Sequence, residues 1–364
     1  MKKYGIELIL ILSIVFTVLT GCSNSEIMEE DVPKDIVSEE VKIENETVEK
    51  IDTIEDYFPF KENTIMEYEG VGNEFAEQKA FFEFIEGNKA QLKIFNPGTV
   101  AIKILEYSNG ELKETYTEGE FYHIENMLNK AKETNNVLIK EPLKPGTSWT
   151  TADGYRRAIT AINMDLELPY KNLKVLEVTT ELGDGIKTMD YYAKDIGHVA
   201  TIYKDGDFEV KTLLDEIENS PYETKMVFYY PHYEDFETLY LNKDIPISTN
   251  ASIEKILGDN FKNPGTDKLI GTISKNTKIN SLKLERGNGI VRVDFSKEFL
   301  EDMNAGSGLE YEILRSITNT LGDYYRVEKV YISIESKPYA SGHFELQEDE
   351  YFEVDKNDIG EFRD

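Results

Sequence analysis

The strongest constraint on the fold is an alternation of apolar and polar residues between about Tyr57 and Leu214. In the run from Ala90 to Ile94, for example, every second residue is apolar, and its neighbours are polar or charged. Because successive side chains of a β-strand point to opposite faces, a period of two is typical of strands with one buried face. Turn sequences separate the runs: Asn96-Pro97-Gly98, Ser108-Asn109-Gly110, Lys144-Pro145-Gly146, Gly183-Asp184-Gly185 and Asp205-Gly206-Asp207. We therefore expect an antiparallel β-rich module over residues 57–220, curved or barrel-like, with Trp149 in its core.

One α-helix is expected inside this module, around Glu120–Thr134. The apolar residues of that stretch would share one helical face, and they are Ile124, Met127, Leu128 and Ala131. Two runs of the module, Leu143–Trp149 and Tyr191–Val199, are similar to a β-rich module of bacterial envelope lipoproteins. That resemblance implies a fold and no activity.

The amino-terminal segment has the organisation of an export signal. Lys2 and Lys3 precede an uncharged, mostly apolar run from Leu8 to Leu19. A helix of that length reaches about 18 Å, which is short of the roughly 30 Å hydrocarbon core of a membrane. A basic start, a short apolar run and small residues before a cleavage point describe a signal peptide, here residues 1–21. The alternative is an uncleaved membrane helix with an unmodified cysteine, and Glu7 at the edge of the run favours that alternative.

The sequence Leu19-Thr20-Gly21-Cys22 resembles the lipobox of bacterial lipoproteins. This resemblance implies that Cys22 is lipidated, with acyl chains such as palmitate, and becomes the first residue of the mature chain. It also implies a protein anchored by lipid at the extracytoplasmic face of the cell membrane. Cys22 is the only cysteine, so disulfides and a cysteine nucleophile are excluded if it is lipidated.

Charge separates the segment after the cysteine from the folded sequence. Residues 23–56 hold thirteen acidic residues against three lysines, and no aromatic residue. Such a segment buries too little apolar area to offset its backbone entropy, so we expect residues 22–56 to form an extended acidic spacer. An acidic docking tail or cation buffer is the alternative. The net charge of the whole chain, −30, argues against nucleic acid as a partner.

The region from Lys225 to Glu345 mixes helical and strand patterns. Strands are expected at Met226–Tyr230, Leu239–Leu241, Thr277–Leu284, Gly289–Phe295 and Lys329–Ile334. Ser252–Asp259 is expected to form a short helix. A longer helix is expected to begin with Ser307 as its N-cap and to end at Gly322, because Leu309, Ile313, Ile317 and Leu321 repeat every four residues. Residues 346–364 carry eight acidic and two basic residues, which predicts a solvated acidic tail.

Residues 225–345 resemble the GerMN domain of sporulation and spore germination proteins. The resemblance rests on the run GIVRVDFSKEF from Gly289 to Phe299, on the helix and strand from Leu309 to Ile334, and on Gly342-His343-Phe344. Glu335-Ser336-Lys337 departs from the family, which more often has an Asp-Gly turn there. The resemblance implies an α+β chain in which the β-rich module precedes a smaller domain of the α/β-sandwich type. It also implies a role in sporulation or germination.

Histidine, serine and aspartate residues are the candidates for a catalytic or metal site. The four histidines, His123, His198, His232 and His343, show no metal-ligand spacing. Gly306-Ser307-Gly308 lacks the G-x-S-x-G pattern of a nucleophile elbow, and Asp205-Gly206-Asp207 lacks the further ligands of a calcium loop. Asp294 is the residue most easily mistaken for a catalytic one. We therefore expect no catalytic residue, no metal and no cofactor.

Two functions of different classes follow from the sequence. The first is a non-enzymatic envelope lipoprotein that works in sporulation or germination through contacts with an envelope protein. Residues 225–345 carry eighteen acidic and fifteen basic residues, and such a balanced surface suits a protein contact. The second is a tethered binding protein whose β-rich module holds an apolar ligand or a glycan. An envelope hydrolase is a third, weaker alternative.

Overall fold

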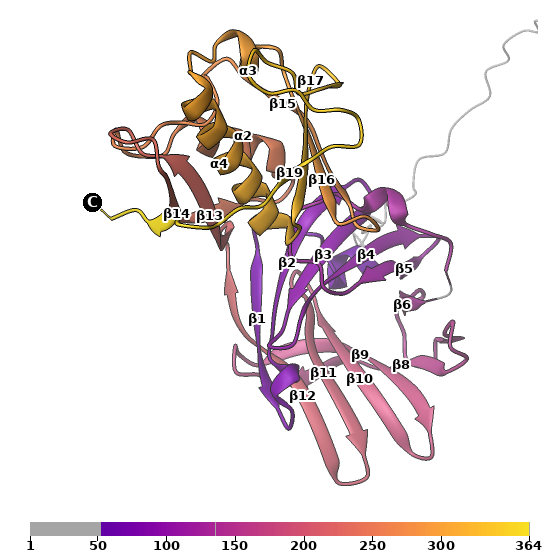
Figure 1. Ribbon diagram of the computed structural model, residues 1–364. Coiled ribbons are helices and arrows are strands. Elements are labelled where there is room, and N and C mark those ends of the chain that lie inside the picture. Colours follow the sequence, from indigo (N-terminus) through magenta and orange to yellow (C-terminus); the bar gives the residue numbers. More distant parts are fainter. Residues whose placement is uncertain (1–51, 135, 364) are drawn as a thin grey trace, which may run out of the picture. The chain divides into compact units, whose positions relative to one another are not determined.

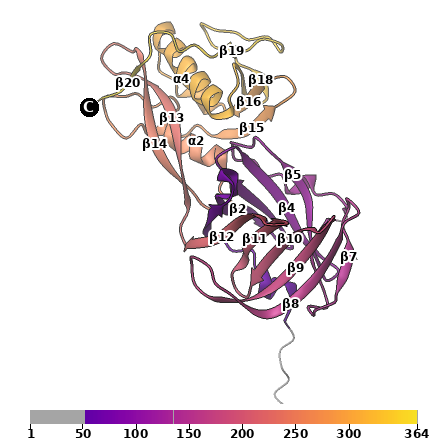
Figure 2. The same ribbon diagram turned by 90° about the horizontal axis from the view of Figure 1, so that it is seen from below.

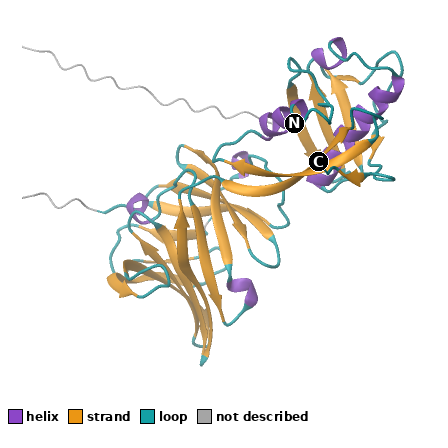
Figure 3. Cartoon of the chain, turned by 90° about the vertical axis from the view of Figure 1, so that its left-hand side faces the viewer, coloured by secondary structure: helices purple, strands orange, loops and turns teal. Residues whose placement is uncertain are grey.

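The computed structural model describes residues 52–134 and 136–363 (Figure 1). Cys22, the expected signal peptide and most of the expected spacer lie outside these residues. Residues 51–364 form one compact unit by their contacts, and strands far outnumber helices in it (Figure 3).

The first twelve strands form one antiparallel sheet, as the alternation predicts. They are β1 (Ile65–Val71), β2 (Gln78–Glu86), β3 (Lys89–Phe95), β4 (Val100–Ser108), β5 (Glu111–Glu118), β6 (Val137–Lys140), β7 (Ser148–Thr150), β8 (Arg156–Leu166), β9 (Leu173–Gly183), β10 (Ile186–Ala193), β11 (Gly197–Asp205) and β12 (Phe208–Glu218). Each strand pairs with its neighbour in sequence, except that β1 pairs with β12 and β6 does not pair with β7. Two six-stranded meanders are therefore joined along β1 and β12 (Figure 2).

Side chains bridge the two free edges of this sheet. The Trp149 indole Nε1, on β7, donates a hydrogen bond to the Val137 carbonyl oxygen on β6 at 2.9 Å. Arg157 Nη1 donates to the same oxygen at 2.7 Å. The sheet is therefore a nearly closed barrel, and the prediction that Trp149 is a buried core residue is confirmed.

The amino-terminal part of the described chain fills the interior of the barrel. A short helix, α1 (Ile54–Tyr57), is closed by a capping box between Thr53 and Asp56. Phe58 and Phe60 follow it and pack on aromatic rings of the sheet, with the Phe60 and Tyr107 rings stacked at 4.4 Å. The interior is thus occupied by side chains.

The expected boundary between the acidic spacer and the β-rich module, near Tyr57, is too late in the sequence. The described residues before Tyr57 belong to the folded part and not to an extended spacer, because the buried side chains of Ile54 and Tyr57 hold them against the sheet. An ion pair of 2.5 Å between Lys194 and Asp52 supports this contact. The charges of this stretch stay near the surface, so the burial of its apolar residues decides the local structure.

The helix expected at Glu120–Thr134 is wrong. The segment is irregular, with a single 3-10 turn η2 (Leu128–Lys130), while a second turn of this kind, η1 (Glu74–Ala76), follows β1. Ile124, Met127 and Leu128 are buried as expected, but the backbone groups of the segment bond to other elements. Gln91 and Lys93 of β3 bond to the carbonyl oxygens of residues 125 and 123, which replaces the hydrogen bonds of a helix.

The remaining strands and helices form a second structural region. They are β13 (Tyr222–Pro231), β14 (Thr238–Ile247), α2 (Ile253–Lys262), β15 (Ile279–Glu285), β16 (Ile290–Phe295), α3 (Glu298–Glu301), α4 (Ser307–Tyr325), β17 (Lys329–Ile334), β18 (Lys337–Pro338), β19 (Phe352–Glu353) and β20 (Gly360–Glu361). One sheet has the order β13-β14-β20, and the other has β15-β16-β17-β18 with β19 also paired to β17. The expected strands and both expected helices are present, and several of them extend further than expected.

Both ends of helix α4 differ from the predicted ones. Gly306 is the N-cap and Ser307 the first helical residue, so the predicted N-cap was one residue late. The helix runs through Gly322 to Tyr325, and Arg326 takes the left-handed conformation that ends it. A Cβ on Gly322 would lie 2.3 Å from the Val354 side chain, so Gly322 permits a close approach and does not end the helix.

The expected solvated tail is also wrong. Residues 346–363 fold back, and β19 pairs antiparallel with β17 while β20 pairs parallel with β14. The Asn319 side chain exchanges two hydrogen bonds with the backbone of Asp355, at 2.7 and 2.9 Å. Phe352 and Phe362 pack on the core. A few spaced apolar residues therefore outweigh the mutual repulsion of the acidic ones.

Candidate functional site

An irregular segment between β5 and β6, residues 119–127, contacts both the barrel and the second region. It is the centre of the candidate site. Beneath it lies a buried ion pair of β2 and β3, in which Lys93 Nζ and Glu83 Oε1 are 2.8 Å apart and the side chains are 7% and 2% exposed. Lys93 also donates to the His123 carbonyl oxygen at 2.7 Å. Gln91 donates to Glu83 at 2.7 Å and accepts from the backbone of Met127 at 2.8 Å. The network satisfies buried polar groups and positions the segment.

The outer side of the segment contacts the second region. The backbone N–H of Ile124 donates to the Tyr324 hydroxyl at 2.8 Å. Arg286, in the turn between β15 and β16, lies 2.8 Å from Glu125 and 2.9 Å from the His123 ring nitrogen. The guanidinium of Arg326 lies over the Tyr122 ring at 3.6 Å. Helix α4 and the β15–β16 turn are thus held against the barrel by aromatic and arginine side chains.

A pocket of about 370 Å³ opens beside these contacts. Its lining includes Tyr122, His123, Arg286, Tyr324 and Arg326, together with Glu120. Arg286 has carboxylate partners. Arg326 lies near Glu120, and its charge helps the hydrogen bonds from Tyr122 and Thr99 to lower the pKa of that carboxyl. In a chain of net charge −30, this pocket offers cationic and aromatic groups, which recognise carboxylates.

The connection between β14 and α2 provides a second attachment. Asn250 Oδ1 accepts from the Ile85 N–H at 2.9 Å, and Asn250 Nδ2 donates to the Ile85 carbonyl oxygen at 3.2 Å. The Thr249 hydroxyl donates to the Phe82 carbonyl oxygen at 2.7 Å. These bonds pair the part of β2 that extends beyond β1, and so they cover a free edge of the barrel sheet.

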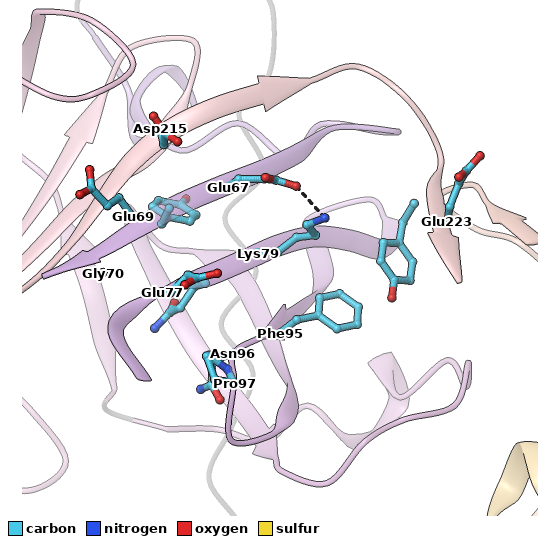
Figure 4. A pocket seen from close by; sticks show the side chains of 13 residues that line it. Glu67, Glu69, Gly70, Glu77, Lys79, Phe95, Asn96, Pro97, Asp215 and Glu223 are labelled. Atoms are coloured by element: carbon cyan, nitrogen blue, oxygen red, sulfur yellow. Dashed lines mark ion pairs between the residues drawn. The ribbon is translucent and has the colours of Figure 1, made fainter. Parts of the chain in front are cut away.

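An open pocket of about 660 Å³ lies on β1, β2 and the neighbouring strands β12 and β13 (Figure 4). Its lining carries five carboxylates: Glu67, Glu69, Glu77, Asp215 and Glu223. Lys79 pairs with Glu67 at 2.6 Å, and the stacked rings of Phe95 and Tyr222 lie 4.7 Å apart at the rim. The described lining contains no histidine, serine or cysteine, so it lacks the serine–histidine or cysteine–histidine pair of many hydrolases.

Asp294 has a structural role. Its Oδ1 accepts hydrogen bonds from the Ser333 hydroxyl at 2.6 Å and from the Ser336 N–H at 2.7 Å. Its Oδ2 accepts from Asn280 at 2.9 Å. Glu335 and Ser336 both have positive φ, 49° and 65°, which glycine adopts more easily. The carboxylate of Asp294 therefore supports the turn in which this sequence lacks the more usual glycine.

We predict that Asp294→Asn leaves the protein folded and that Asp294→Ala destabilises it. An asparagine oxygen can still accept from Ser333 and Ser336. Alanine leaves the partly buried Ser336 N–H without this acceptor, and it leaves the Ser333 hydroxyl with only the longer bond to the Val293 carbonyl oxygen, at 3.4 Å. The expected cost of the alanine variant is about 1–3 kcal/mol. Urea denaturation followed by circular dichroism measures it. Equal losses in both variants would show that the charge, and not the acceptor geometry, matters.

The histidines occupy four separate places. His123 lies in the segment described above, His198 lies 3.8 Å from Asp190 inside the barrel module, and His232 lies 2.9 Å from Asp235 in a hairpin loop. His343 Nδ1 lies 2.5 Å from the buried Glu310. Burial raises the pKa of Glu310, but hydrogen bonds from Ser341, Tyr339 and His343 outweigh it and hold that pKa below its usual range. Among the described residues, no group of three or more histidine, cysteine, aspartate or glutamate side chains could hold a metal ion.

The structure also shows where other residues considered in the sequence lie. Ser307 is exposed at the start of α4, and Asp205-Gly206-Asp207 forms the β11–β12 turn, as predicted. Cys22 lies outside the described residues. In residues 52–134 and 136–363, no helix is long and apolar enough to cross a membrane. Sequence reasoning missed both pockets, because their lining residues come from strands and turns that only the fold brings together.

Comparison with known proteins gives one family. Residues 227–340 match the family model described as Germane: Sporulation and spore germination. No curated protein matches the chain. The match to the family model agrees with the resemblance seen in the sequence.

Three solved structures show low similarity. Tandem GerMN domains of the sporulation protein GerM from Bacillus subtilis are 16% identical, with a TM-score of 0.29, over 36% of this chain and 46% of that one. The first GerMN domain of the same protein is 15% identical, with a TM-score of 0.29, over 37% and 99%. A candidate lipoprotein from Clostridium perfringens is 19% identical, with a TM-score of 0.23, over 36% and 87%. This chain thus spans just under half of the tandem structure.

Proposed function

Because this chain carries a GerMN domain over residues 227–340, we propose that it acts without catalysis in sporulation or spore germination, through contacts with an envelope protein. The family match is the observation that carries this proposal. The barrel interior supports it, since side chains of α1 and the sheet occupy the space that an apolar ligand would need.

We further propose that the protein is a lipoprotein on the extracytoplasmic face of the cell membrane. In this organisation residues 1–21 are the signal peptide, Cys22 carries the lipid, and an acidic spacer leads to the barrel module. The α/β-sandwich domain of residues 225–345 follows. A bare anionic membrane surface repels a chain of net charge −30, so the lipid has to provide the anchor.

The anchor gives the first test. Wild-type protein should incorporate a fatty-acid analogue and fractionate with membranes, whereas Cys22→Ala should carry no label, because the alanine has no thiol to acylate. Labelling of sporulating cells followed by fractionation measures both. Unlabelled wild-type protein would contradict the lipoprotein assignment and would leave the GerMN assignment intact.

The role in sporulation has a separate test. A deletion strain should produce fewer heat-resistant spores or spores that germinate slowly, and wild-type protein should restore them. Asp294→Asn should also restore them, because it keeps the turn and because Asp294 has no catalytic role in the proposed function. Failure of a folded Asp294→Asn protein, together with turnover of an envelope substrate by the wild type, would contradict the contact-only function.

A further inference from the structure

The loop between β13 and β14 presents two aromatic side chains to solvent. Tyr233 is 66% exposed and Phe236 is 44% exposed. Exposed aromatic residues on an ordered loop are typical of the residues that dominate protein interfaces. We call His232–Glu237 the aromatic loop.

The aromatic loop is fixed by hydrogen bonds on both sides. The Tyr233 N–H donates to the Lys268 carbonyl oxygen at 2.8 Å, and the Phe236 N–H donates to the His232 carbonyl oxygen at 2.9 Å. The Asp235 carboxylate lies 2.9 Å from the His232 ring and accepts from the Glu237 N–H at 3.1 Å. The backbone of the loop is therefore held in place before any partner is bound, which lowers the entropy lost on binding.

The backbone of Phe236 is in an unfavourable conformation. Its φ is 62°, in the left-handed region that a bulky residue rarely adopts. Glycine would fit this position with less strain and would leave less apolar surface in water. A residue that is strained and also exposed is poorly explained by stability, and such positions gather at functional sites.

The charges of the aromatic loop point to its partner. Glu234, Asp235 and Glu237 lie beside the two aromatic residues in the sequence of the loop, so a partner with an aromatic or apolar pocket and a cationic rim would complement it. The pocket of about 370 Å³ described above has this character, because its lining holds Tyr122 and Tyr324 together with two arginines, Arg286 and Arg326, against one carboxylate, Glu120. An acidic loop is disfavoured at an anionic membrane.

The loop and the pocket of one chain lie near opposite ends of α4 (Figure 1). Thr238, directly after the loop, bonds to Glu312 in the first half of the helix at 2.5 Å, whereas Tyr324 and Tyr325 at its other end line the pocket. A helix of this length spans about 28 Å. A loop therefore reaches the pocket of a second copy and not its own.

We propose that the aromatic loop of one copy docks into the pocket of about 370 Å³, lined by Arg326, of the next copy. This contact places Phe236 among the tyrosine rings of the pocket and the carboxylates of the loop beside Arg326. The contact is head-to-tail, so an open assembly keeps one free loop at one end and one free pocket at the other unless a ring closes. The proposal does not depend on a role in sporulation, because self-association is a property of the purified chain.

Sedimentation equilibrium of the full-length chain in a density-matched detergent tests the proposal. Wild type should self-associate with a dissociation constant in the micromolar range, and more weakly at high salt. Phe236→Gly and Arg326→Glu should each weaken association at least about tenfold. Phe236→Gly should unfold at the same temperature as wild type or at a higher one, which a structural role for the ring would not allow. Phe236→Asn is the second loop variant, because asparagine tolerates the left-handed region.

Mixing the two variants separates a head-to-tail contact from other arrangements. The loop of Arg326→Glu is intact and the pocket of Phe236→Gly is intact, so an equimolar mixture should form dimers and no larger species. Phe208→Ala is the matched control, since Phe208 is 54% exposed on the barrel module and should not affect association. A wild-type chain that stays monomeric, unchanged association of Phe236→Gly, or a mixture that stays monomeric would each overturn the proposal.

Discussion

Ile317→Asp is expected to unfold the second structural region, residues 222–363. Ile317 is 0% exposed in the middle of α4, where the core of both sheets surrounds it. The substitution loses about 1.5–3 kcal/mol of apolar burial and places a carboxylate where no described cation is in contact with it. Together these effects are comparable with the whole stability of a domain, about 5–15 kcal/mol. Urea denaturation followed by far-ultraviolet circular dichroism measures the loss.

Ser307→Asp is the matched control for this variant. It introduces the same carboxylate on the same helix, but at an exposed first-turn position where the helix dipole favours negative charge. Its midpoint should stay close to that of the wild type. A cooperative transition of Ile317→Asp at the wild-type midpoint would contradict the assigned core.

Lys93→Met is expected to cost about 3–5 kcal/mol, because it leaves Glu83 buried without its cation. The carboxylate would keep only the hydrogen bond from Gln91. The carbonyl oxygen of His123 would also lose its donor, which loosens the segment that carries the contact between Ile124 and Tyr324. Chemical denaturation of the single variants and the double variant measures the coupling between the two charges.

The double variant Lys93→Met with Glu83→Gln should recover most of this loss, because the remaining amides can bond to each other. Lys174→Met is the control on an exposed pair, where Lys174 and Asp165 are 61% and 78% exposed. It should change stability by less than about 1 kcal/mol. If the double variant is no more stable than Lys93→Met alone, the cost comes from lost packing and not from the unpaired charge.

Local patterns predicted much of this fold. The alternation between Tyr57 and Leu214 predicted the barrel strands, because burial of one face imposes a period of two on each strand. Turns such as Gly183-Asp184-Gly185 were also confirmed, with Asp184 and Gly185 at φ 51° and 82°, since tight hairpins need residues that accept positive φ. The GerMN domain was predicted from the run Gly289–Phe299, which includes β16, and from the apolar residues that repeat every four positions on α4.

The wrong predictions share one physical cause. The stretch around Ile124 has a helical pattern, and the last residues have the composition of a solvated tail, but both are held by partners far away in sequence. Gln91 and Lys93 take the backbone groups that a helix would have used, and Asn319 takes those of Asp355. Gly322 also serves a contact that is distant in sequence, because Val354 packs where a side chain at this position would lie.

The sequence by itself therefore determined the strands, the turns and the identity of the GerMN domain, because neighbouring residues decide these through periodicity and backbone conformation. That Asp294 is not catalytic stays a prediction, and its carboxylate accepts hydrogen bonds from Ser333, Ser336 and Asn280. Only the tertiary structure decided which charges are buried, where Arg326 meets Tyr122, and that Phe236 stands exposed in a strained loop. Burial and pairing depend on the surroundings in space, which the order of residues along the chain does not state.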